Sequence, residues 1–397
     1  MTVSLDFLDD QAIEAHRRVV AARISKAARA GKLAIVGSAE LPRKCARAIG
    51  ESYAPPAAFI EYDARFWERA IDGIPVLPPD VAMARIGPDA LCIAGVWSPN
   101  HCYAETRDWL HAFGFSDVMP VHAVAWAVPE VLGRHYQLSP PGVLADRRAD
   151  AERILGALFD EESRRNFAGM LRWRVTLDPA TLPEADRRRA YFDPRLFDLG
   201  ADPVIVDVGA FDGDSLRSYL LWHGARLGRF FAIEPDPQSF AKLDAFVRAL
   251  PGSIADRITA LPLAVSDRAG ELRLAATGKP GSGGDNDGQV VTVRSARLDT
   301  ELSDLAAIDY LKFDIEGAEA AALEGAWSLI ARHRPVIGIA AYHKPADVLD
   351  IPLAFIERFP DWRFHFRAHD RDGIDFVFYA VPPGREARPL PKPSTDS

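Results

Sequence analysis

The sequence predicts an α/β protein with two Rossmann-like sheets, and three observations support this. Residues 204–208 are mostly apolar and β-branched, as in a strand covered on both faces, and a glycine-containing turn follows at 209–213. A second strand pattern ends at Ile233-Glu234-Pro235, about twenty residues further on, where such a fold places an acidic residue. Near the start of the chain, Leu33 to Gly37 repeats the pattern of a short apolar strand that ends in glycine. We therefore expect a sheet flanked by helices in each half of the chain.

The first segment alternates helix and strand patterns. Asp9 to Ala30 has apolar residues at helical spacing, and Leu41 to Ile49 predicts a second helix. Strands are predicted at Leu33–Gly37, Ala58–Ile60 and Ala90–Val96. This alternation is typical of a small Rossmann-like domain.

Residues 139–142, with two prolines and a glycine, mark the best domain boundary, because they stop a continuing helix. Apolar positions between Ala149 and Arg174 then predict two helices ahead of the second sheet. The end of the chain is rich in proline and charge and is expected to be disordered. The expected organisation is a Rossmann-like domain (1–138), a helical linker or cover (139–195), a larger α/β domain (196–382) and a disordered tail (383–397).

The larger domain is predicted to hold five strands followed by an antiparallel pair. The five are Val204–Val208, Arg229–Glu234, Ile258–Val265, Tyr310–Phe313 and Val336–Tyr342, and the pair is Trp362–Arg367 with Asp375–Ala380. Leu272–Leu274 and Gln289–Arg294 predict an added hairpin, and the glycine-rich stretch 277–288 is expected to be a mobile surface loop. This strand order predicts the α/β fold of class I methyltransferases, preceded by the smaller Rossmann-like α/β domain.

Composition excludes several partners. The chain has 397 residues with a net charge of −9 and a pI near 5.6, which disfavours binding to nucleic acid. Its three cysteines are too few for a disulfide framework, and the start of the chain shows no signal sequence, so a cytoplasmic location is expected. No run of about eighteen apolar residues predicts a membrane span.

The turn after the first strand of the larger domain is acidic. Asp207, Asp212 and Asp214 would repel a pyrophosphate, whereas they would attract the amino group and sulfonium of S-adenosylmethionine. The charge pattern therefore favours S-adenosyl-L-methionine over a dinucleotide as the cofactor, with Glu234 accepting hydrogen bonds from the ribose. The alternative is a Rossmann-type turn that binds no ligand.

Several short motifs occur together between Asp160 and Ala380. They are Tyr191-Phe192, 207–214, 233–235, 264–267, 297–299 and 312–319. By these motifs the segment resembles the FkbM family of S-adenosylmethionine-dependent methyltransferases, and 342–345 with 367–369 resemble a bacterial subgroup of it. The resemblance implies methyl transfer to oxygen, commonly on sugars or on polyketide and other natural-product hydroxyls.

The resemblance also implies a cofactor site, position by position. Asp207, Gly209 and Gly213 would line the methionine end and Glu234 the ribose, while Ala264, Val265 and Ser266 would lie near the adenine. The other expected cofactor-binding residues are Ala210, Phe211, Pro235 and Asp314.

Three carboxylates follow the predicted strand Tyr310–Phe313. Asp314, Glu316 and Glu319 would lie at the carboxyl edge of the sheet, where ligands bind in open α/β folds, and would repel one another unless a positive group lies there. Asp314 and Glu316 are candidates for catalysis and Glu319 for substrate binding. The alternatives are hydrogen bonds to a sugar, a divalent metal, or, for the two glutamates, complementation of the helix dipole.

His343 follows the strand Val336–Tyr342 and is predicted to face the same edge. It is the best candidate for the general base that removes a hydroxyl proton from the acceptor. The alternatives are a structural histidine, a substrate-binding residue or a metal ligand. Lys344 and His369 are candidates for binding an anionic substrate such as a phosphate or a uronic acid.

The first domain resembles the nucleotide-sugar-binding domain that precedes the catalytic β-helix of bacterial sugar acetyltransferases. The shared residues are 35–40, 59–61 and 71–77, although Gly37-Ser38-Ala39 stands where that family usually has Gly-Ala-Gly. The domain is expected either to recognise a nucleotide-linked sugar or to serve packing and assembly into a homo-oligomer.

The sequence thus predicts an O-methyltransferase that acts on a small-molecule or glycan acceptor. One alternative is a non-catalytic scaffold protein that keeps the cofactor fold. A second is a sugar-nucleotide oxidoreductase that uses the first domain.

Overall fold

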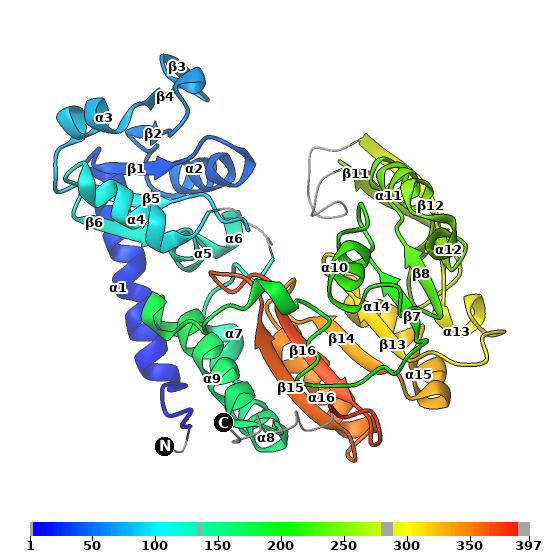
Figure 1. Cartoon of the computed structure of the whole chain (residues 1–397). Helices are drawn as coiled ribbons and strands as arrows, with labels where there is room; N and C mark the ends of the chain where they lie inside the picture. Colours follow the sequence, from blue (N-terminus) through cyan, green and yellow to red (C-terminus); the bar gives the residue numbers. More distant parts are fainter. Residues whose placement is uncertain (1–2, 100, 133–135, 279–288, 388–397) are drawn as a thin grey trace, which may run out of the picture. The chain divides into compact units, whose positions relative to one another are not determined.

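The computed structural model describes residues 3–99, 101–132, 136–278 and 289–387 (Figure 1). The chain divides into two compact units. Unit 1 comprises Met1–Leu155, Arg164–Ala185 and Asp370–Ile374, and unit 2 comprises Gly156–Ser163, Asp186–His369 and Asp375–Ser397. The expected glycine-rich loop at 277–288 lies outside the described residues from 279 onward, as does the expected tail from 388 onward.

Unit 1 is an α/β unit built on a six-stranded sheet in the order β3-β4-β2-β1-β5-β6. All neighbours pair in parallel except β3 and β4. The strands are β1 (Leu33–Val36), β2 (Ala58–Ile60), β3 (Arg69–Ile71), β4 (Ile74–Leu77), β5 (Leu91–Ala94) and β6 (Asp117–Pro120). The helices are α1 (Asp10–Arg29), α2 (Glu40–Ser52), α3 (Pro79–Ile86), α4 (Tyr103–Ala112), α5 (His122–Ala127), α6 (Pro129–Leu132) and α7 (Gly142–Ala145). Helices α8 (Arg148–Ala157) and α9 (Glu161–Thr176) have residues in both units.

The sequence pattern of unit 1 explains its first elements. Asp9 caps α1 by accepting a hydrogen bond from the N–H of Ala12, and the apolar face of this helix buries Ile13, Val20 and Ile24. The central strand β1 is buried along its whole length, as its unbroken apolar sequence predicts.

Unit 2 is built on a seven-stranded sheet in the order β15-β16-β14-β13-β7-β8-β9. Strands β9, β8, β7, β13 and β14 are parallel, and β16 is antiparallel to both of its neighbours. The strands are β7 (Val204–Val208), β8 (Arg229–Ile233), β9 (Ile258–Leu261), β13 (Tyr310–Phe313), β14 (Val336–Ala340), β15 (Arg363–Ala368) and β16 (Phe376–Val381). The helices are α10 (Asp214–His223), α11 (Pro237–Ala249), α12 (Gly252–Ala255), α13 (Leu298–Glu301), α14 (Glu319–Glu324), α15 (Trp327–His333) and α16 (Asp347–Arg358). Five parallel strands followed by an antiparallel pair confirm the predicted fold.

One strand was predicted as a single element, but the structure divides it into two. Ile258–Val265 divides into β9, in the main sheet, and β10 (Ala264–Val265). Pro262 explains the break, because proline has no N–H to donate to a strand ladder. β10 joins a separate three-stranded sheet with β12 (Gln289–Ala296) and β11 (Gly270–Ala276), and the antiparallel β11–β12 pair is the predicted hairpin.

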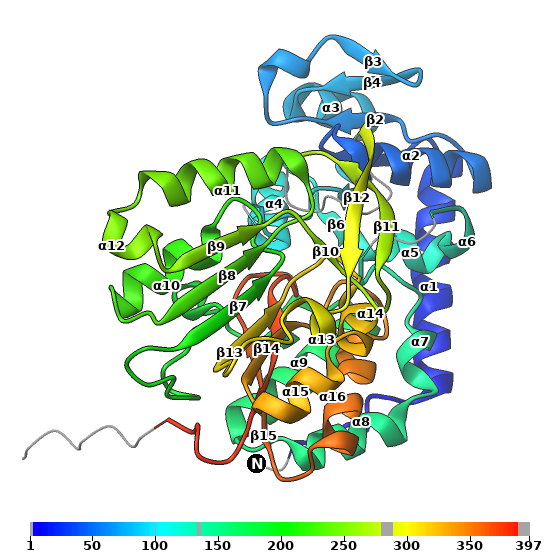
Figure 2. The same cartoon turned by 90° about the vertical axis from the view of Figure 1, so that its right-hand side faces the viewer.

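One face of the main sheet packs against α10, α11 and the segment 190–199. Figure 2 shows these two helices beside β7, β8 and β9. The shared core includes Ile205 and Phe230 from the sheet, Leu216 from α10 and Leu243 from α11. This packing places the N-terminal ends of both helices at the carboxyl edge of the sheet.

A row of polar residues crosses the same face. Asp207 pairs with Lys312, Lys312 with Gly338, and Gly338 with Tyr379. Residues paired across neighbouring strands point to the same side of a sheet. The row therefore brings a carboxylate, an ammonium and a phenol together inside a core that is otherwise largely apolar.

In the part of the chain that the structure describes, no helix is both long and apolar enough to cross a membrane.

Candidate active site

The acidic turn lies where β7 and β13 end side by side. Gly209 has a φ of +86°, and a Cβ atom there would lie 1.8 Å from the carbonyl oxygen of Asp314. Gly213 has a φ of +92°, and a Cβ atom there would lie 2.7 Å from the ring of Phe246 on α11. Both positions therefore require glycine, because a side chain would meet backbone or a packed ring in a conformation that L-residues rarely adopt.

Glu234 directly follows β8 and stabilises this turn. One carboxylate oxygen accepts a hydrogen bond from the N–H of Phe211 at 2.9 Å, and the other accepts from the N–H of Asp236 at 2.8 Å. Phe211 has a φ of +46°, so the carboxylate helps to hold a strained residue. Burial raises the pKa of Glu234 to about 7, although both N–H donors oppose that shift.

Lys312 is the buried cation at the centre of the site. Its Nζ donates to Asp207 Oδ1 at 2.9 Å and to the carbonyl of Gly209 at 3.0 Å, and lies 3.8 Å from Asp314 Oδ2. Burial by itself would lower the pKa of Lys312, but the surrounding carboxylates, Asp207 first, raise it above its ordinary value. Burial also raises the pKa of Asp207 to about 6, with Lys312 opposing the shift, so the pair is charged at neutral pH.

His343 is a second cation and lies among three carboxylates. Its Nδ1 hydrogen-bonds Glu319 Oε1 at 2.8 Å, and its Nε2 lies 3.5 Å from Asp314 Oδ1 and 3.4 Å from Glu316 Oε2. Burial by itself favours the neutral ring, but the carboxylates, Glu319 first, raise the pKa of His343 to about 10. The ring is therefore protonated at neutral pH and offsets the repulsion among the carboxylates.

The loop after β13 has the backbone geometry to hold this cluster. Glu316 has a φ of +57° and Gly317 a φ of +99°, so the chain makes a tight turn before α14 begins at Glu319. Glu319 is buried and also accepts a hydrogen bond from the N–H of Ile315 at 2.9 Å. The two bonds on Oε1 fix Glu319 as the support of both the loop and the histidine.

The structure brings most of the predicted site residues to one edge. These are Asp207, Gly209, Ala210, Phe211, Gly213, Glu234, Pro235, Asp314, Glu316, Glu319, His343 and Lys344. The Lys344 side chain is exposed beside Gly317, and the backbone N–H of Lys344 donates to the carboxylate of Asp347. Val265 and Ser266 lie on or just after β10, in the three-stranded sheet.

His369 is placed differently from the other candidates. It is buried, with Nδ1 hydrogen-bonded to the carbonyl of Asp186 at 2.9 Å and Nε2 to the hydroxyl of Tyr379 at 2.7 Å. Both ring nitrogens thus have internal partners, and burial lowers the pKa of the imidazole. This geometry indicates a histidine that supports the fold, whereas the sequence predicted one that binds substrate.

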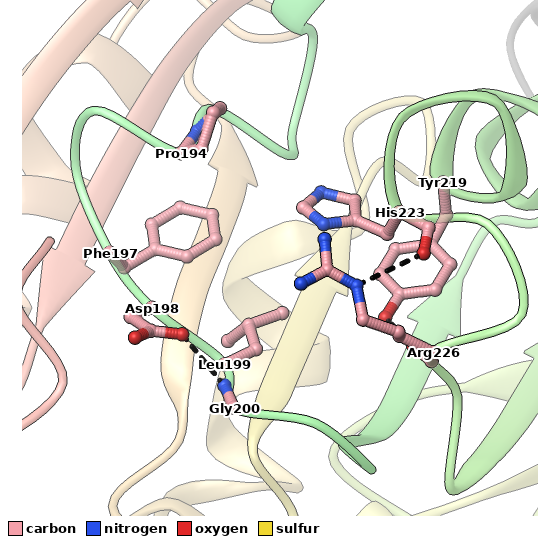
Figure 3. A pocket seen from close by; sticks show the side chains of 8 residues that line it. All are labelled: Pro194, Phe197, Asp198, Leu199, Gly200, Tyr219, His223 and Arg226. Carbon is pink, nitrogen blue, oxygen red and sulfur yellow. Dashed lines mark hydrogen bonds between the residues drawn. The ribbon is translucent and has the colours of Figure 1, made fainter. Parts of the chain in front are cut away.

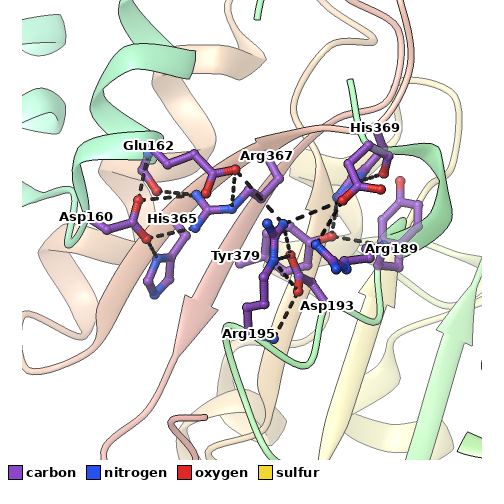
Figure 4. A network of polar contacts seen from close by, with 12 residues as sticks. Asp160, Glu162, Arg189, Asp193, Arg195, His365, Arg367, His369 and Tyr379 are labelled. Carbon is purple, nitrogen blue, oxygen red and sulfur yellow. Dashed lines mark hydrogen bonds and ion pairs between the residues drawn. The ribbon is translucent and has the colours of Figure 1, made fainter. Parts of the chain in front are cut away.

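His369 belongs to a wider polar network on β15 and β16 (Figure 4). Asp160 accepts from His365 at 2.6 Å and from Arg367 at 2.9 Å, and Arg195 forms a bidentate ion pair with Asp193. The network ties residues 160–163 and 186–195 to the sheet. It thereby fixes the segment that leads into Tyr191.

The sequence analysis gave no role in the site to three residues, Lys312, Asp236 and Tyr191, although Lys312 and Tyr191 lie in its motifs. A lysine inside the four-residue strand Tyr-Leu-Lys-Phe was the available signal, because a buried strand admits a charged residue only when it is paired. Asp236 caps α11 and also accepts from the N–H groups of Thr277 and Gly278. The conformation of Tyr191 depends on contacts with distant strands, and no local sequence pattern predicts such contacts.

A pocket of about 220 Å³ lies at the other end of α10 (Figure 3). Its lining residues are Pro194, Phe197, Asp198, Leu199, Gly200, Tyr219, His223 and Arg226. Because α10 begins beside the acidic turn and has ten residues, the pocket is roughly 15 Å along the helix from that turn. It is separate from the carboxyl edge.

Within the described ranges, no group of three or more His, Cys, Asp and Glu side chains has the arrangement of a metal site. Asp314, Glu316 and Glu319 instead surround the ring of His343.

The strand order and the acidic carboxyl edge define an α/β fold of the class I methyltransferase type. Residues 207–371 match the family model of the methyltransferase FkbM domain. Residues 207–371 are therefore an FkbM methyltransferase domain, and this domain supports a methyltransferase activity.

A solved structure shares this fold. The crystal structure of methyltransferase FkbM from Methylobacillus flagellatus KT aligns with a TM-score of 0.73 and 20% identity, over 94% of this chain and 100% of that chain. Two further structures align with TM-scores of only 0.29. They are a precorrin-6y C5,15-methyltransferase from Geobacter metallireducens GS-15 (16% identity, 47% of this chain and 83% of that chain) and the Aeropyrum pernix fibrillarin in complex with S-adenosyl-L-methionine (13% identity, 48% and 73%). No curated protein matches the sequence significantly.

Replacing Lys312 by methionine should destabilise unit 2 by about 3–5 kcal/mol, because it leaves the Asp207 carboxylate buried without its cation. Chemical denaturation of the purified protein measures this. The double variant Asp207→Asn with Lys312→Met should regain much of the loss, whereas Lys344→Met, at an exposed lysine of the same edge, should change stability by less than about 0.5 kcal/mol. Equal stability of wild type and Lys312→Met would contradict the central role of the ion pair.

Proposed function

We propose that the protein is an S-adenosylmethionine-dependent O-methyltransferase acting on a hydroxyl of a sugar, glycan or natural product. The observation that carries this proposal is the convergence of Asp207, Glu234 and Asp314 on one sheet edge of an FkbM domain. A cofactor with a cationic centre and a ribose suits such an edge better than a pyrophosphate does.

The residues present fit this cofactor by their chemistry. Glu234 lies at the end of β8, where an acidic residue accepts from ribose hydroxyls, and Asp207 and Asp214 add negative charge near the glycine turn. When bound, the cofactor supplies an electrophilic methyl group on a sulfonium. The turn and the carboxylates would hold that group in line with the acceptor oxygen, which is where much of the rate would come from.

Proton removal from the acceptor would fall to Asp314 or Glu316. Each carboxylate keeps some exposure, 24% and 22% of its side chain, while His343 is fully covered. Because His343 already carries a proton in this arrangement, we assign it a supporting role: it holds both carboxylates in position and stabilises their charge. Glu319 in turn orients the histidine, and Lys344 is the exposed cation that would meet an anionic acceptor.

Unit 1 would bind the nucleotide-linked form of a sugar. Its carboxyl edge holds Gly37, with a φ of +87°, and Ser38, whose hydroxyl donates to Glu61 at 2.7 Å. Tyr62 stacks on Trp109 with ring centroids 3.9 Å apart, and such an aromatic surface suits a sugar or a base. The alternative role in packing or assembly predicts no affinity for small molecules.

Two other functions are less well supported. A non-catalytic scaffold would have no need of the strained turn and the charged cluster described above. An oxidoreductase would need a dinucleotide-binding turn in unit 1, in which a second glycine stands two positions after the first. Here Ala39 occupies that position after Gly37 and Ser38. The cysteines at 45, 92 and 102 are buried and free, in keeping with the proposed cytoplasmic location.

Calorimetric titration with S-adenosylmethionine tests the cofactor. We expect micromolar binding that strengthens as the pH rises from 6 to 8, because Glu234 has a pKa of about 7 and must lose its proton to accept from both ribose hydroxyls. Glu234→Gln should bind about tenfold or more weakly at pH 8 and lose most of this pH dependence. Asp244→Asn, at a surface carboxylate of α11, serves as the control. Unchanged affinity in Glu234→Gln would place the ribose elsewhere.

The pH profile of kcat at saturating cofactor tests the base. If His343 were the base, kcat would climb between pH 7 and 10, because its pKa is about 10. We expect no such climb, and a fall of at least about a hundredfold in kcat for Asp314→Asn or Glu316→Gln, whichever residue is the base. A rate that rises steadily to pH 10 and disappears in His343→Gln would restore the histidine as the base.

Binding of UDP-glucose tests unit 1. We expect measurable affinity that falls about tenfold in Tyr62→Ala, because the stacking surface is lost. Tyr53→Ala, at a tyrosine bonded to the carbonyl of Ala127, is the matched control. An absence of binding by wild type for UDP-, GDP- and dTDP-linked sugars would favour the packing role.

A further inference from the structure

Tyr191 is held in a strained conformation by two buried tyrosines. Its φ is +64°, in the left-handed region that non-glycine residues rarely adopt. Its N–H donates to the hydroxyl of Tyr379 at 2.9 Å, and its carbonyl accepts from the hydroxyl of Tyr310. Two strands of the sheet, β16 and β13, therefore fix the backbone of this one residue from both sides.

The ring of Tyr191 is fixed as well. Its centroid lies 4.8 Å from Nζ of Lys312, within cation–π range. At the neighbouring position of the same row, a Cβ atom on Gly338 would lie 3.3 Å from Cδ1 of Tyr191. The missing side chain at Gly338 leaves room for the ring, and the whole residue is only 6% exposed.

The hydroxyl of Tyr191 is buried and has no hydrogen-bond partner among the described residues. Burial, with the carboxylate of Asp314 adding to it, raises the pKa of Tyr191 well above its usual value. The group therefore keeps its proton and is a hydrogen-bond donor. A buried donor without a partner destabilises the folded state, and a strained backbone adds to that cost, so the two together indicate a ligand contact.

Several other donors of the site have partners. The N–H groups of Gly209 and Ala210 both donate to the carbonyl of Ile233, and that of Phe211 donates to Glu234. The ammonium of Lys312 and the Nδ1 of His343 are bonded to carboxylates. The site is thus rich in acceptors, which suit the amino and sulfonium groups of the cofactor, but these acceptors would repel its carboxylate.

We propose that Tyr191 is a cofactor-binding residue whose hydroxyl donates a hydrogen bond to the carboxylate of the amino-acid portion of S-adenosylmethionine. This inference rests on the proposed function. Tyr191 would thus recognise the carboxylate, which is the one anionic group of an otherwise cationic ligand. Lys312 supports the contact from beneath the ring by adding positive charge near the bound carboxylate.

Calorimetry with two ligands tests the inference. Tyr191→Phe should bind S-adenosylmethionine about ten- to hundredfold more weakly than wild type, as expected for a lost hydrogen bond to a charged group. The same variant should bind decarboxylated S-adenosylmethionine within about twofold of wild type, because that ligand lacks the acceptor. Tyr342→Phe is the matched control, since this buried hydroxyl is bonded to Asp375 at 3.1 Å, and it should leave the ratio of the two affinities unchanged.

Thermal unfolding gives a second readout. Removal of a hydroxyl that has no partner should leave the melting temperature of Tyr191→Phe equal to or above that of wild type in the absence of ligand. A lower melting temperature would show that the hydroxyl supports the fold, and would overturn the inference.

The outcomes separate the two proposals. Wild type that binds S-adenosylmethionine supports the proposed function. If Tyr191→Phe then loses affinity equally for both ligands, or loses affinity for neither ligand, the inference about Tyr191 is wrong and the proposed function stands. A fall in kcat with unchanged cofactor affinity would assign the hydroxyl to the acceptor and would also overturn it. If wild type binds neither ligand, the proposed function fails, and this inference fails with it.

Discussion

The buried ion pair between Lys312 and Asp207 is the interaction on which the site depends. The two residues face each other on neighbouring parallel strands, where both charges are removed from water. Such a pair is maintained only with good geometry and additional hydrogen bonds, and Lys312 obtains one from the carbonyl of Gly209. The ammonium thereby links the strand, the glycine turn and, at 3.8 Å, the carboxylate of Asp314.

Charge balance continues along the edge through His343. Several carboxylates lie close together after β7, β8 and β13, and the two internal cations make this arrangement tolerable. The ring of His343 takes the central position among Asp314, Glu316 and Glu319 that the sequence left open for a positive group or a metal. Its raised pKa follows from these neighbours and changes its expected chemistry from accepting a proton to holding one.

Three strained residues lie at or near this edge. Phe211, Glu316 and Tyr191 all have positive φ values, and each is held by hydrogen bonds or by a neighbouring turn. Strained residues persist only where the surrounding structure fixes them, and they are common at ligand sites. The polar network on β15 and β16 supplies part of that support for the segment that carries Tyr191.

The sequence by itself determined the fold class, most of the strands and the acidic carboxyl edge, because apolar runs, glycine turns and strand-end carboxylates are local patterns. It misplaced the end of Ile258–Val265, where Pro262 moves β10 into another sheet. Only the tertiary structure decided the partner of Lys312, the protonation of His343, the fold-supporting role of His369 and the conformation of Tyr191. Each of these features depends on how deeply a side chain is buried and on contacts with side chains from distant strands. The spacing of residues along the chain reports neither burial nor such contacts.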